Sequence, residues 1–293
     1  MSHTSSAPIV VGIDGSASSS AALDWAVEAA RRRHTRLRLV HAIDMAGSAS
    51  TVGSWPPVDV QRDMAWSVLT TALADLEDVD VAVETSLGVG RPTPVLLDEA
   101  DRAQMVVLGS RGRSDLVGLL TGSTSLQLAM HATCPVIVVR AGVSEHAGGR
   151  SAGHVIVGVD GSEVSEAAIS FAFEEAATSR VGLTALHAWE WPDQHLDAHD
   201  GLWAAAQEAE EAVLAERLAG WTEKYPDVEV TRVTRRADPA GALVDESAGA
   251  ALTVVGSRGS GGFKGLLLGS VSHAALQYAD SPVAVVRTRG DSR

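Results

Sequence analysis

A glycine-rich motif that could bind phosphate occurs twice in this chain, each time directly after a short apolar run. In each copy, a Gly-Ser-Arg-Gly segment is followed after nine residues by Gly-Ser. Glycines let backbone N–H groups approach phosphate oxygens closely, and a helix starting at the later glycine favours negative charge at its N-terminus. The hydroxyls and the arginine add donors and a cation. The two copies are Gly109–Gly112 with Gly122 and Ser123, and Gly256–Gly259 with Gly269 and Ser270.

An Asp-Gly-Ser segment also occurs twice, as Asp14–Ser16 and Asp160–Ser162. His41 and His187 are separated by the same interval as these two aspartates, and the glycine motifs by one residue more. This interval far exceeds the period of solenoid repeats, so it indicates a duplicated domain. The chain of 293 residues suits two domains of ordinary size. We expect domains at 1–143 and 154–293, joined by a Gly- and Ser-rich linker at 144–153.

Each half reads as strands alternating with amphipathic helices, which predicts an α/β fold with a parallel sheet covered on both faces. In the first half we expect strands at 8–13, 37–43, 79–85, 105–108 and 136–139, and helices at 21–33, 58–76, 94–101 and 123–131. In the second half we expect strands at 155–159, 183–189, 228–233, 252–255 and 283–286, and helices at 165–178, 202–224, 239–247 and 270–278.

A parallel sheet of this kind binds ligands beyond the carboxyl ends of its strands, where the strand order reverses. Asp14–Ser16 follows the first expected strand, and Gly109–Gly112 follows the fourth. If these two strands are neighbours, their loops form opposite sides of one crevice. The second half repeats this arrangement with Asp160–Ser162 and Gly256–Gly259.

Composition and charge exclude several classes of protein. The formal net charge of −14 disfavours binding to nucleic acid and to anionic membrane surfaces. Cys134 is the single cysteine, so neither an internal disulfide nor a cysteine-rich metal site is expected. No run is long enough to span a membrane, and the N-terminal segment lacks the features of a signal peptide. We therefore expect a cytoplasmic protein without membrane insertion.

Both halves resemble universal stress protein domains. The resemblance rests on Val11–Ser16 and Val157–Ser162 at the openings, on the two glycine motifs, and on the Cys134–Val136 and Ser281–Val283 segments that enter the last strands. It covers nearly the whole chain and is similar to the tandem-domain type of mycobacteria and related actinobacteria. It implies two doubly wound domains, each with a five-stranded parallel sheet in the order 3-2-1-4-5, of the kind shared with the adenine nucleotide α-hydrolases.

The resemblance also implies that both domains bind ATP, with Mg²⁺ held by its phosphates and by no set of protein side chains alone. Regulatory interactions with an unidentified protein during stress or slowed growth would follow, and homodimers could form through the final strands. The implied nucleotide-binding residues of the first domain are Gly12, Asp14, Gly15, Ser16, Ala42, Gly109, Ser110, Arg111, Gly112, Arg113, Gly122, Ser123 and Thr124. Those of the second domain are Gly158, Asp160, Gly161, Ser162, Ala188, Gly256, Ser257, Arg258, Gly259, Gly262, Gly269, Ser270 and Val271.

The two copies of the glycine motif differ in charge and in glycine content. Asp115 brings a negative charge to the first copy, whereas 260–265 in the second is glycine-rich, which favours the second site. The lysine of a P-loop is missing from both, and no nucleophile is paired with a base, so no catalytic residue is assigned. Two alternatives stay open: a slow ATPase that uses the same pockets, and a structural adaptor without nucleotide.

The remaining histidines and tryptophans carry weaker signals. For His41 and His187 we favour a structural hydrogen bond over a contact with adenine. The other histidines show no pairing that would hold a metal. Trp189, Trp191 and Trp203 could cover a base or pack the domains together, and we favour packing.

Overall fold

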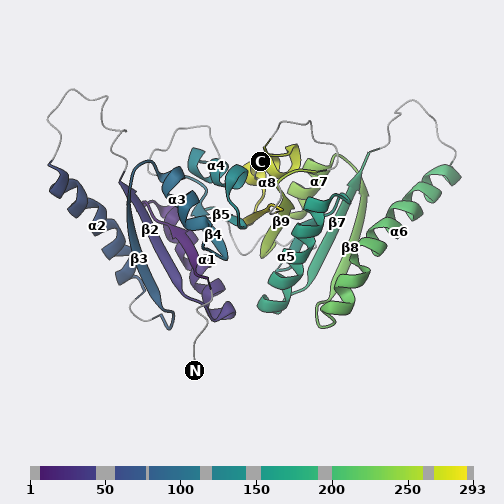
Figure 1. The fold of residues 1–293 in the computed structure, drawn as a ribbon. Coiled ribbons are helices and arrows are strands. Elements are labelled where there is room, and N and C mark those ends of the chain that lie inside the picture. Colours follow the sequence, from purple (N-terminus) through teal and green to yellow (C-terminus); the bar gives the residue numbers. More distant parts are fainter. Residues whose placement is uncertain are drawn as a thin grey trace. The chain divides into compact units, whose positions relative to one another are not determined.

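The computed structural model describes residues 7–43, 57–76, 79–112, 121–142, 153–190, 200–259 and 267–288. The chain divides into two compact units, the first reaching Gly142 and the second holding the described residues from Gly153 onward. Each unit alternates strands and helices, with helices on both faces of its sheet (Figure 1). The predicted doubly wound α/β fold is therefore confirmed for both halves.

Unit 1 contains a five-stranded sheet in the order β3-β2-β1-β4-β5, and every pairing between these strands is parallel. This is the predicted 3-2-1-4-5 order, and it makes β1 and β4 neighbours. The elements are β1 (Ile9–Gly12), α1 (Ala17–Arg33), β2 (Leu37–Ile43), α2 (Val58–Ala74), β3 (Val83–Val89), α3 (Pro92–Ala100), β4 (Met105–Gly109), α4 (Ser123–His131) and β5 (Val136–Val139).

Unit 2 repeats this topology in the order β8-β7-β6-β9-β10, again with parallel pairings. Its α6 is longer than the corresponding α2. The elements are β6 (Val155–Gly158), α5 (Glu163–Ser179), β7 (Leu183–Trp189), α6 (Asp200–Lys224), β8 (Val230–Arg236), α7 (Pro239–Glu246), β9 (Leu252–Gly256), α8 (Ser270–Tyr278) and β10 (Val283–Val286).

The third strand of each unit lies later in the chain than predicted. We expected strands at 79–85 and 228–233, whereas β3 covers Val83–Val89 and β8 covers Val230–Arg236. The chain before β3 forms turn-like bonds, such as the one from the N–H of Val81 to the carbonyl of Val79. Both strands lie at the end of their unit's strand order and are half exposed, so their apolar pattern defines their limits poorly.

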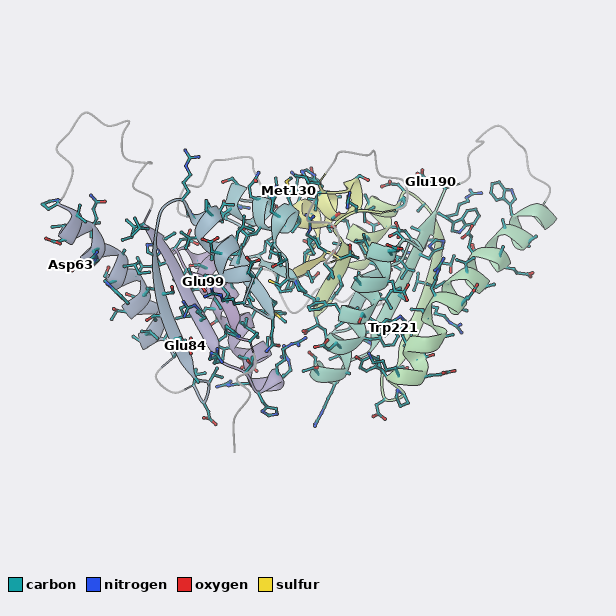
Figure 2. The ribbon with its side chains drawn as sticks, in the orientation of Figure 1. Asp63, Glu84, Glu99, Met130, Glu190 and Trp221 are labelled. Atoms are coloured by element: carbon teal, nitrogen blue, oxygen red, sulfur yellow. The ribbon has the colours of Figure 1, made fainter. Side chains whose placement is uncertain are left out.

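The central strands form the core of each unit. In β1, β4, β5 and their counterparts in unit 2, nearly every residue is buried, as expected for strands covered on both faces. Small residues of α1 and α5 pack against these strands, and Ala22, Ala26 and Ala30 are fully buried. In unit 2, Phe173 of α5 is fully buried and stacks with Trp221 of α6 and with Tyr225 just after it, which fixes the outer helix to the core. Figure 2 labels Trp221.

We predict that Cys134 does not react in the folded protein. This side chain is buried just before β5, and burial raises the pKa of its thiol to about 12. Because the thiolate is the reactive form, a disulfide reagent such as DTNB at pH 8 should label less than a tenth of the protein within an hour. In guanidinium chloride the same reagent should label one thiol per chain within minutes. Rapid labelling of the folded chain would contradict this burial.

Candidate functional site

The loop after the first strand of each unit is built around an aspartate. In unit 1, the Oδ1 atom of Asp14 accepts hydrogen bonds from the N–H of Ser16 at 3.0 Å and from its hydroxyl at 2.6 Å. The hydroxyl oxygen of Ser16 in turn accepts from the N–H of Ser19 and caps α1. Gly15 takes φ +79°, a left-handed conformation that suits glycine. The carboxylate is thereby fixed at the start of the helix.

Unit 2 contains the same arrangement with nearly the same distances. Oδ1 of Asp160 accepts from the N–H of Ser162 at 3.0 Å and from its hydroxyl at 2.7 Å. Ser162 caps α5 through the N–H of Ser165, and Gly161 has φ +78°. The capped helices begin at Ala17 and Glu163, earlier than the predicted helix starts, because the Asp-Gly-Ser turn leads directly into the first helical turn.

The second loop joins the fourth strand of each unit to the following helix. Gly122 and Gly269 are the N-caps of α4 and α8, and among the described residues no N-cap side chain bonds the first N–H groups of either helix. The hydroxyls of Ser125 and Ser272 instead donate to the carbonyls of Gly109 and Ser257 and hold the loop to the helix. The first turn of each helix therefore presents N–H donors to an anion.

The two loops touch at the aspartate. A Cβ added at Gly112 would lie 2.8 Å from Oδ2 of Asp14, and one at Gly259 would lie 2.5 Å from Oδ2 of Asp160. A Cβ at Gly109 would collide with the backbone of Ser18. Glycine at these positions therefore permits the contact between the loops. The first and fourth strands are neighbours in both units, as the predicted crevice requires.

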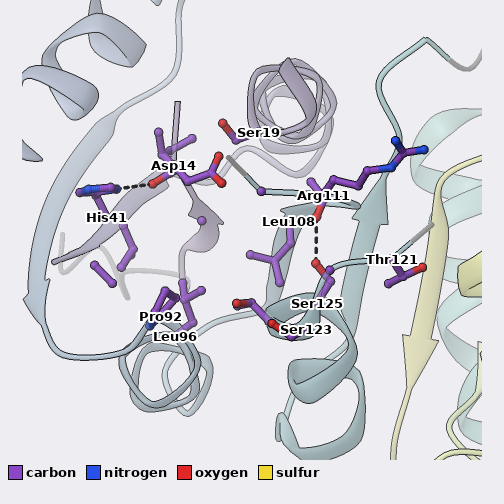
Figure 3. A pocket seen from close by; sticks show the side chains of 18 residues that line it. Asp14, Ser19, His41, Pro92, Leu96, Leu108, Arg111, Thr121, Ser123 and Ser125 are labelled. Atoms are coloured by element: carbon purple, nitrogen blue, oxygen red, sulfur yellow. Dashed lines mark hydrogen bonds between the residues drawn. The ribbon is translucent and has the colours of Figure 1, made fainter. Parts of the chain in front are cut away.

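In unit 1, these loops enclose a cavity of about 250 Å³. Figure 3 shows Asp14 and Ser123 on two sides of it, while Pro92 and Leu96 of α3 form part of a third. The cavity has an apolar wall from the ends of β2, α3 and β4 and a polar wall from the two loops. The lining residues are Gly12, Ile13, Asp14, Ser19, Val40, His41, Ala42, Pro92, Leu96, Leu108, Gly109, Arg111, Gly112, Thr121, Gly122, Ser123, Thr124 and Ser125.

Most of the residues predicted for the first site line this cavity, but some do not. Ser110 is buried and exposes 2% of its surface, and Gly15 and Ser16 shape the loop without lining the cavity. Arg113 lies outside the described residues. Sequence reasoning missed Pro92 and Leu96, which belong to α3 and line the cavity. No local motif marks such a helix.

The predicted residues of the second site occupy the corresponding positions in unit 2. Gly158 ends β6, Ala188 lies near the end of β7, and Ser270 and Val271 begin α8. Ser257 is fully buried and so contributes its backbone, while Gly262 lies outside the described residues. The units differ at their first glycine. A Cβ at Gly12 would collide with Leu108, whereas one at Gly158 would meet only ordinary contacts.

Positive charge gathers at the glycine loop of unit 2. Arg258 lies in the loop, and Arg287 follows β10, the strand that pairs with β9. Burial, and then the positive charge of Arg258, lowers the pKa of the Arg287 guanidinium. The pair therefore favours a neighbouring anion.

Both repeated histidines make structural hydrogen bonds, as we favoured from the sequence. Nδ1 of His41 donates to the carbonyl of Ile13 at 2.6 Å, and Nδ1 of His187 donates to the carbonyl of Val159 at 2.7 Å. Each bond fixes the residue just before the aspartate.

Two further sequence expectations concern metals and tryptophans. Within the described residues, no group of three or more His, Cys, Asp or Glu side chains could hold a metal ion. Trp203 packs over the guanidinium of Arg236 in the same unit, 4.2 Å from the ring centre, and Trp191 lies outside the described residues. In the described part of the chain, no helix is long and apolar enough to cross a membrane.

The sequence profile described as the Universal stress protein family matches residues 6–140 and 152–287. The chain belongs to the universal stress protein family. A universal stress protein of Mycobacterium tuberculosis is 41% identical over 297 residues, which cover 95% of this chain and 96% of the relative. One from Mycolicibacterium smegmatis is 41% identical over 298 residues, covering 96% and 97%. The tandem two-domain architecture is thus confirmed.

The fold of the whole chain is similar to that of a universal stress protein from Archaeoglobus fulgidus. The TM-score is 0.68 at 18% identity, with 96% of this chain and 98% of the other covered. At this identity the similarity concerns the fold alone. It agrees with the strand order found in each universal stress protein domain of the chain.

We predict that Ser162→Ala destabilises the second domain. The substitution removes the cap on the N–H of Ser165 and one donor to Asp160, which should lower the free energy of unfolding by about 1 kcal/mol. Urea denaturation followed by circular dichroism measures this change. Thr222→Ala is the control, because its exposed hydroxyl bonds only a carbonyl of its own helix. Equal effects of the two substitutions would contradict the capping role.

Proposed function

We propose that each domain of this universal stress protein binds ATP, and that the nucleotide-loaded protein regulates a partner protein during stress or slowed growth in the cytoplasm. The single observation that carries the binding proposal is the contact between the aspartate loop and the glycine loop at an uncapped helix. This arrangement offers N–H donors to phosphates and, close beside them, a carboxylate.

The two walls of the cavity suit the two ends of a nucleotide. Gly109–Gly112 and the start of α4 would hold the phosphates, with hydroxyls of Ser123 and Thr124 as further donors. Asp14 would accept from a ribose hydroxyl, as carboxylates do in other doubly wound folds. The apolar wall at Val40 and Leu96 would receive the base. Unit 2 offers the equivalent loops, with Arg258 and Arg287 where unit 1 has Arg111 and Arg140.

Mg²⁺ enters the proposal through the nucleotide. Because the described residues form no metal site of their own, the ion would be held chiefly by phosphate oxygens, with Asp14 or Asp160 as the nearest protein carboxylate. Phosphate-bound Mg²⁺ of this kind keeps several water ligands. The protein groups would orient the phosphates, and the ion would neutralise part of their charge.

The same pockets could support slow hydrolysis, which is the first alternative. Oδ1 of Asp160 already accepts two bonds from Ser162, so it is poorly placed to activate water as well. Turnover by the purified full chain, compared with Asp160→Ala, separates the two functions. Hydrolysis that disappears in the variant while ATP binding persists would favour the enzyme. The second alternative, an adaptor without nucleotide, predicts no binding.

We predict two ATP molecules per chain, and one after either glycine loop is disrupted. Gly109→Asp places side-chain atoms where Ser18 lies and adds negative charge beside the phosphates. Gly256→Asp has both effects in the second domain, where its side chain would collide with Val164. Each substitution should lower the ATP affinity of its own site by more than about 100-fold, equivalent to roughly 3 kcal/mol of binding free energy. Equilibrium dialysis with labelled ATP and Mg²⁺ counts the sites.

Gly220→Ala is the matched control for these glycine variants. Gly220 lies on α6 with open space where a Cβ would be, so this variant should keep both sites. Full stoichiometry in Gly109→Asp would refute the assignment of that loop, and no bound nucleotide at millimolar ATP would refute the proposal. Light scattering of the loaded and unloaded protein tests the further expectation that β5 or β10 pairs in a homodimer.

A further inference from the structure

Two hydrogen bonds and one close contact connect helix α6 to the glycine loop of the second domain. Glu210 of α6 contacts His187 of β7, with 2.9 Å between Oε2 and Nε2. The same imidazole donates from Nδ1 to the carbonyl of Val159, the residue before Asp160. Asp160 lies against Gly259. Three side chains thus join the outer helix to the floor of the proposed nucleotide site, and Figure 1 shows α6 beside β8 at the end of this unit's sheet.

The Val159–Asp160 peptide is held at both of its polar atoms. Its carbonyl accepts from His187, and its N–H donates to the hydroxyl of Ser165 at 3.2 Å. A peptide fixed in this way cannot rotate without breaking one of the two bonds. Because the Asp160 side chain leaves the backbone directly after this peptide, His187 holds the backbone from which the carboxylate extends, while the two bonds from Ser162 hold the carboxylate itself.

The contact between His187 and Glu210 requires a particular charge state. A backbone carbonyl only accepts, so Nδ1 must carry a proton. A carboxylate also only accepts, so Nε2 must carry one too, and the ring is then an imidazolium beside an anion. When the imidazole loses a proton, its Nε2 lone pair faces the carboxylate oxygen, and the bond to α6 is lost.

The first domain has a different residue at this place. The buried residues Ala65 and Leu69 of α2 correspond to Leu214 and Leu218 of α6, and the same alignment places Gln61 where α6 has Glu210. An amide both donates and accepts, so it can pair with an imidazole in either charge state. A carboxylate at this position of the outer helix is therefore specific to the second domain.

We propose that Glu210 is a positioning residue for the second nucleotide site, acting through His187 to hold Asp160 against the glycine loop and making nucleotide affinity at this site depend on pH. This inference rests on the proposed function, since it concerns the same site. The charged pair exists only while the ring carries both protons, so loss of one proton at higher pH lowers the affinity. The first site lacks the carboxylate and keeps its affinity.

Other charged groups on the elements around His187 modify this balance. Arg217 of α6 lies near Gly161, and Arg232 and Arg236 lie on β8, which pairs with β7. Their positive charges oppose the imidazolium, whereas the negative charge of Asp160 supports it. On α7, Glu246 is already paired with Arg235. The Glu210 side chain is 34% exposed, so solvent screens the pair and a moderate effect is expected.

The test measures ATP affinity of the full chain between pH 6.0 and 8.5, with the first site disabled by Gly109→Asp. In this background, affinity at the second site should fall about threefold to tenfold more than the affinity of the first site measured in Gly256→Asp. Comparing the two sites removes the titration of ATP itself. Adding Glu210→Gln should flatten the profile, because glutamine keeps a hydrogen bond to His187 in both charge states.

Glu211→Gln is the matched control. It removes the same charge from α6, but the glutamate that it replaces bonds Gln207. It should leave the profile of the second site unchanged. Identical profiles for the Glu210→Gln and Glu211→Gln variants would overturn the proposal, as would equal pH dependence of the two sites. If Glu210→Gln changed the Tm but left the pH dependence of ATP affinity unchanged, Glu210 would have only a structural role.

The ligand-free protein provides an independent measurement. Nitrogen-15 NMR of His187, assigned with His187→Gln, should show protons on both ring nitrogens at pH 6.0 and a titration that shifts in Glu210→Gln. A ring that titrates identically in both proteins overturns the pairing itself. Intact pairing in a protein that binds no ATP instead overturns the proposed function, and with it the role of Glu210 in binding.

Discussion

The arrangement of each domain depends on one contact, in which the carboxylate after the first strand lies against a glycine after the fourth. A residue with a side chain in this place would displace the aspartate, because a Cβ at Gly112 or Gly259 would collide with its Oδ2 atom. The contact requires the two strands to be neighbours, which the reversed strand order supplies. It also brings the carboxylate, which attracts cations, close to backbone N–H groups that attract anions. The proposed binding site thus contains groups for both kinds of charge in a small space.

Residues that act locally could be predicted from the sequence, and those that act across elements could not. The Asp-Gly-Ser turns and the glycine loops could be recognised in the sequence because each consists of adjacent residues in a fixed conformation. The limits of β3 and β8 were wrong because a half-exposed strand at the end of a sheet has a weak apolar pattern. Leu96 and Glu210 were missed because each reaches its neighbour through the fold, from a helix with no motif of its own.

The two domains have kept their backbone and diverged in their supporting side chains. The aspartate turns agree to about 0.1 Å in their hydrogen bonds. Around them, Val68 of α2 faces Gly15 where Arg217 of α6 faces Gly161, and Leu108 crowds Gly12 more closely than any residue crowds Gly158. The duplicated chain thus contains two similar crevices in unlike surroundings, which allows each to respond differently to the same ligand.

The order of the strands along the chain has a consequence for synthesis. Each domain brings the loop after its first strand against the loop beyond its fourth strand, with three strands and three helices between them. During translation, the aspartate turn leaves the ribosome long before its glycine partner, so the crevice is among the last features to form. A ligand held there would stabilise only chains in which the fourth strand and the loop beyond it have already been made, and each domain would gain this stabilisation separately.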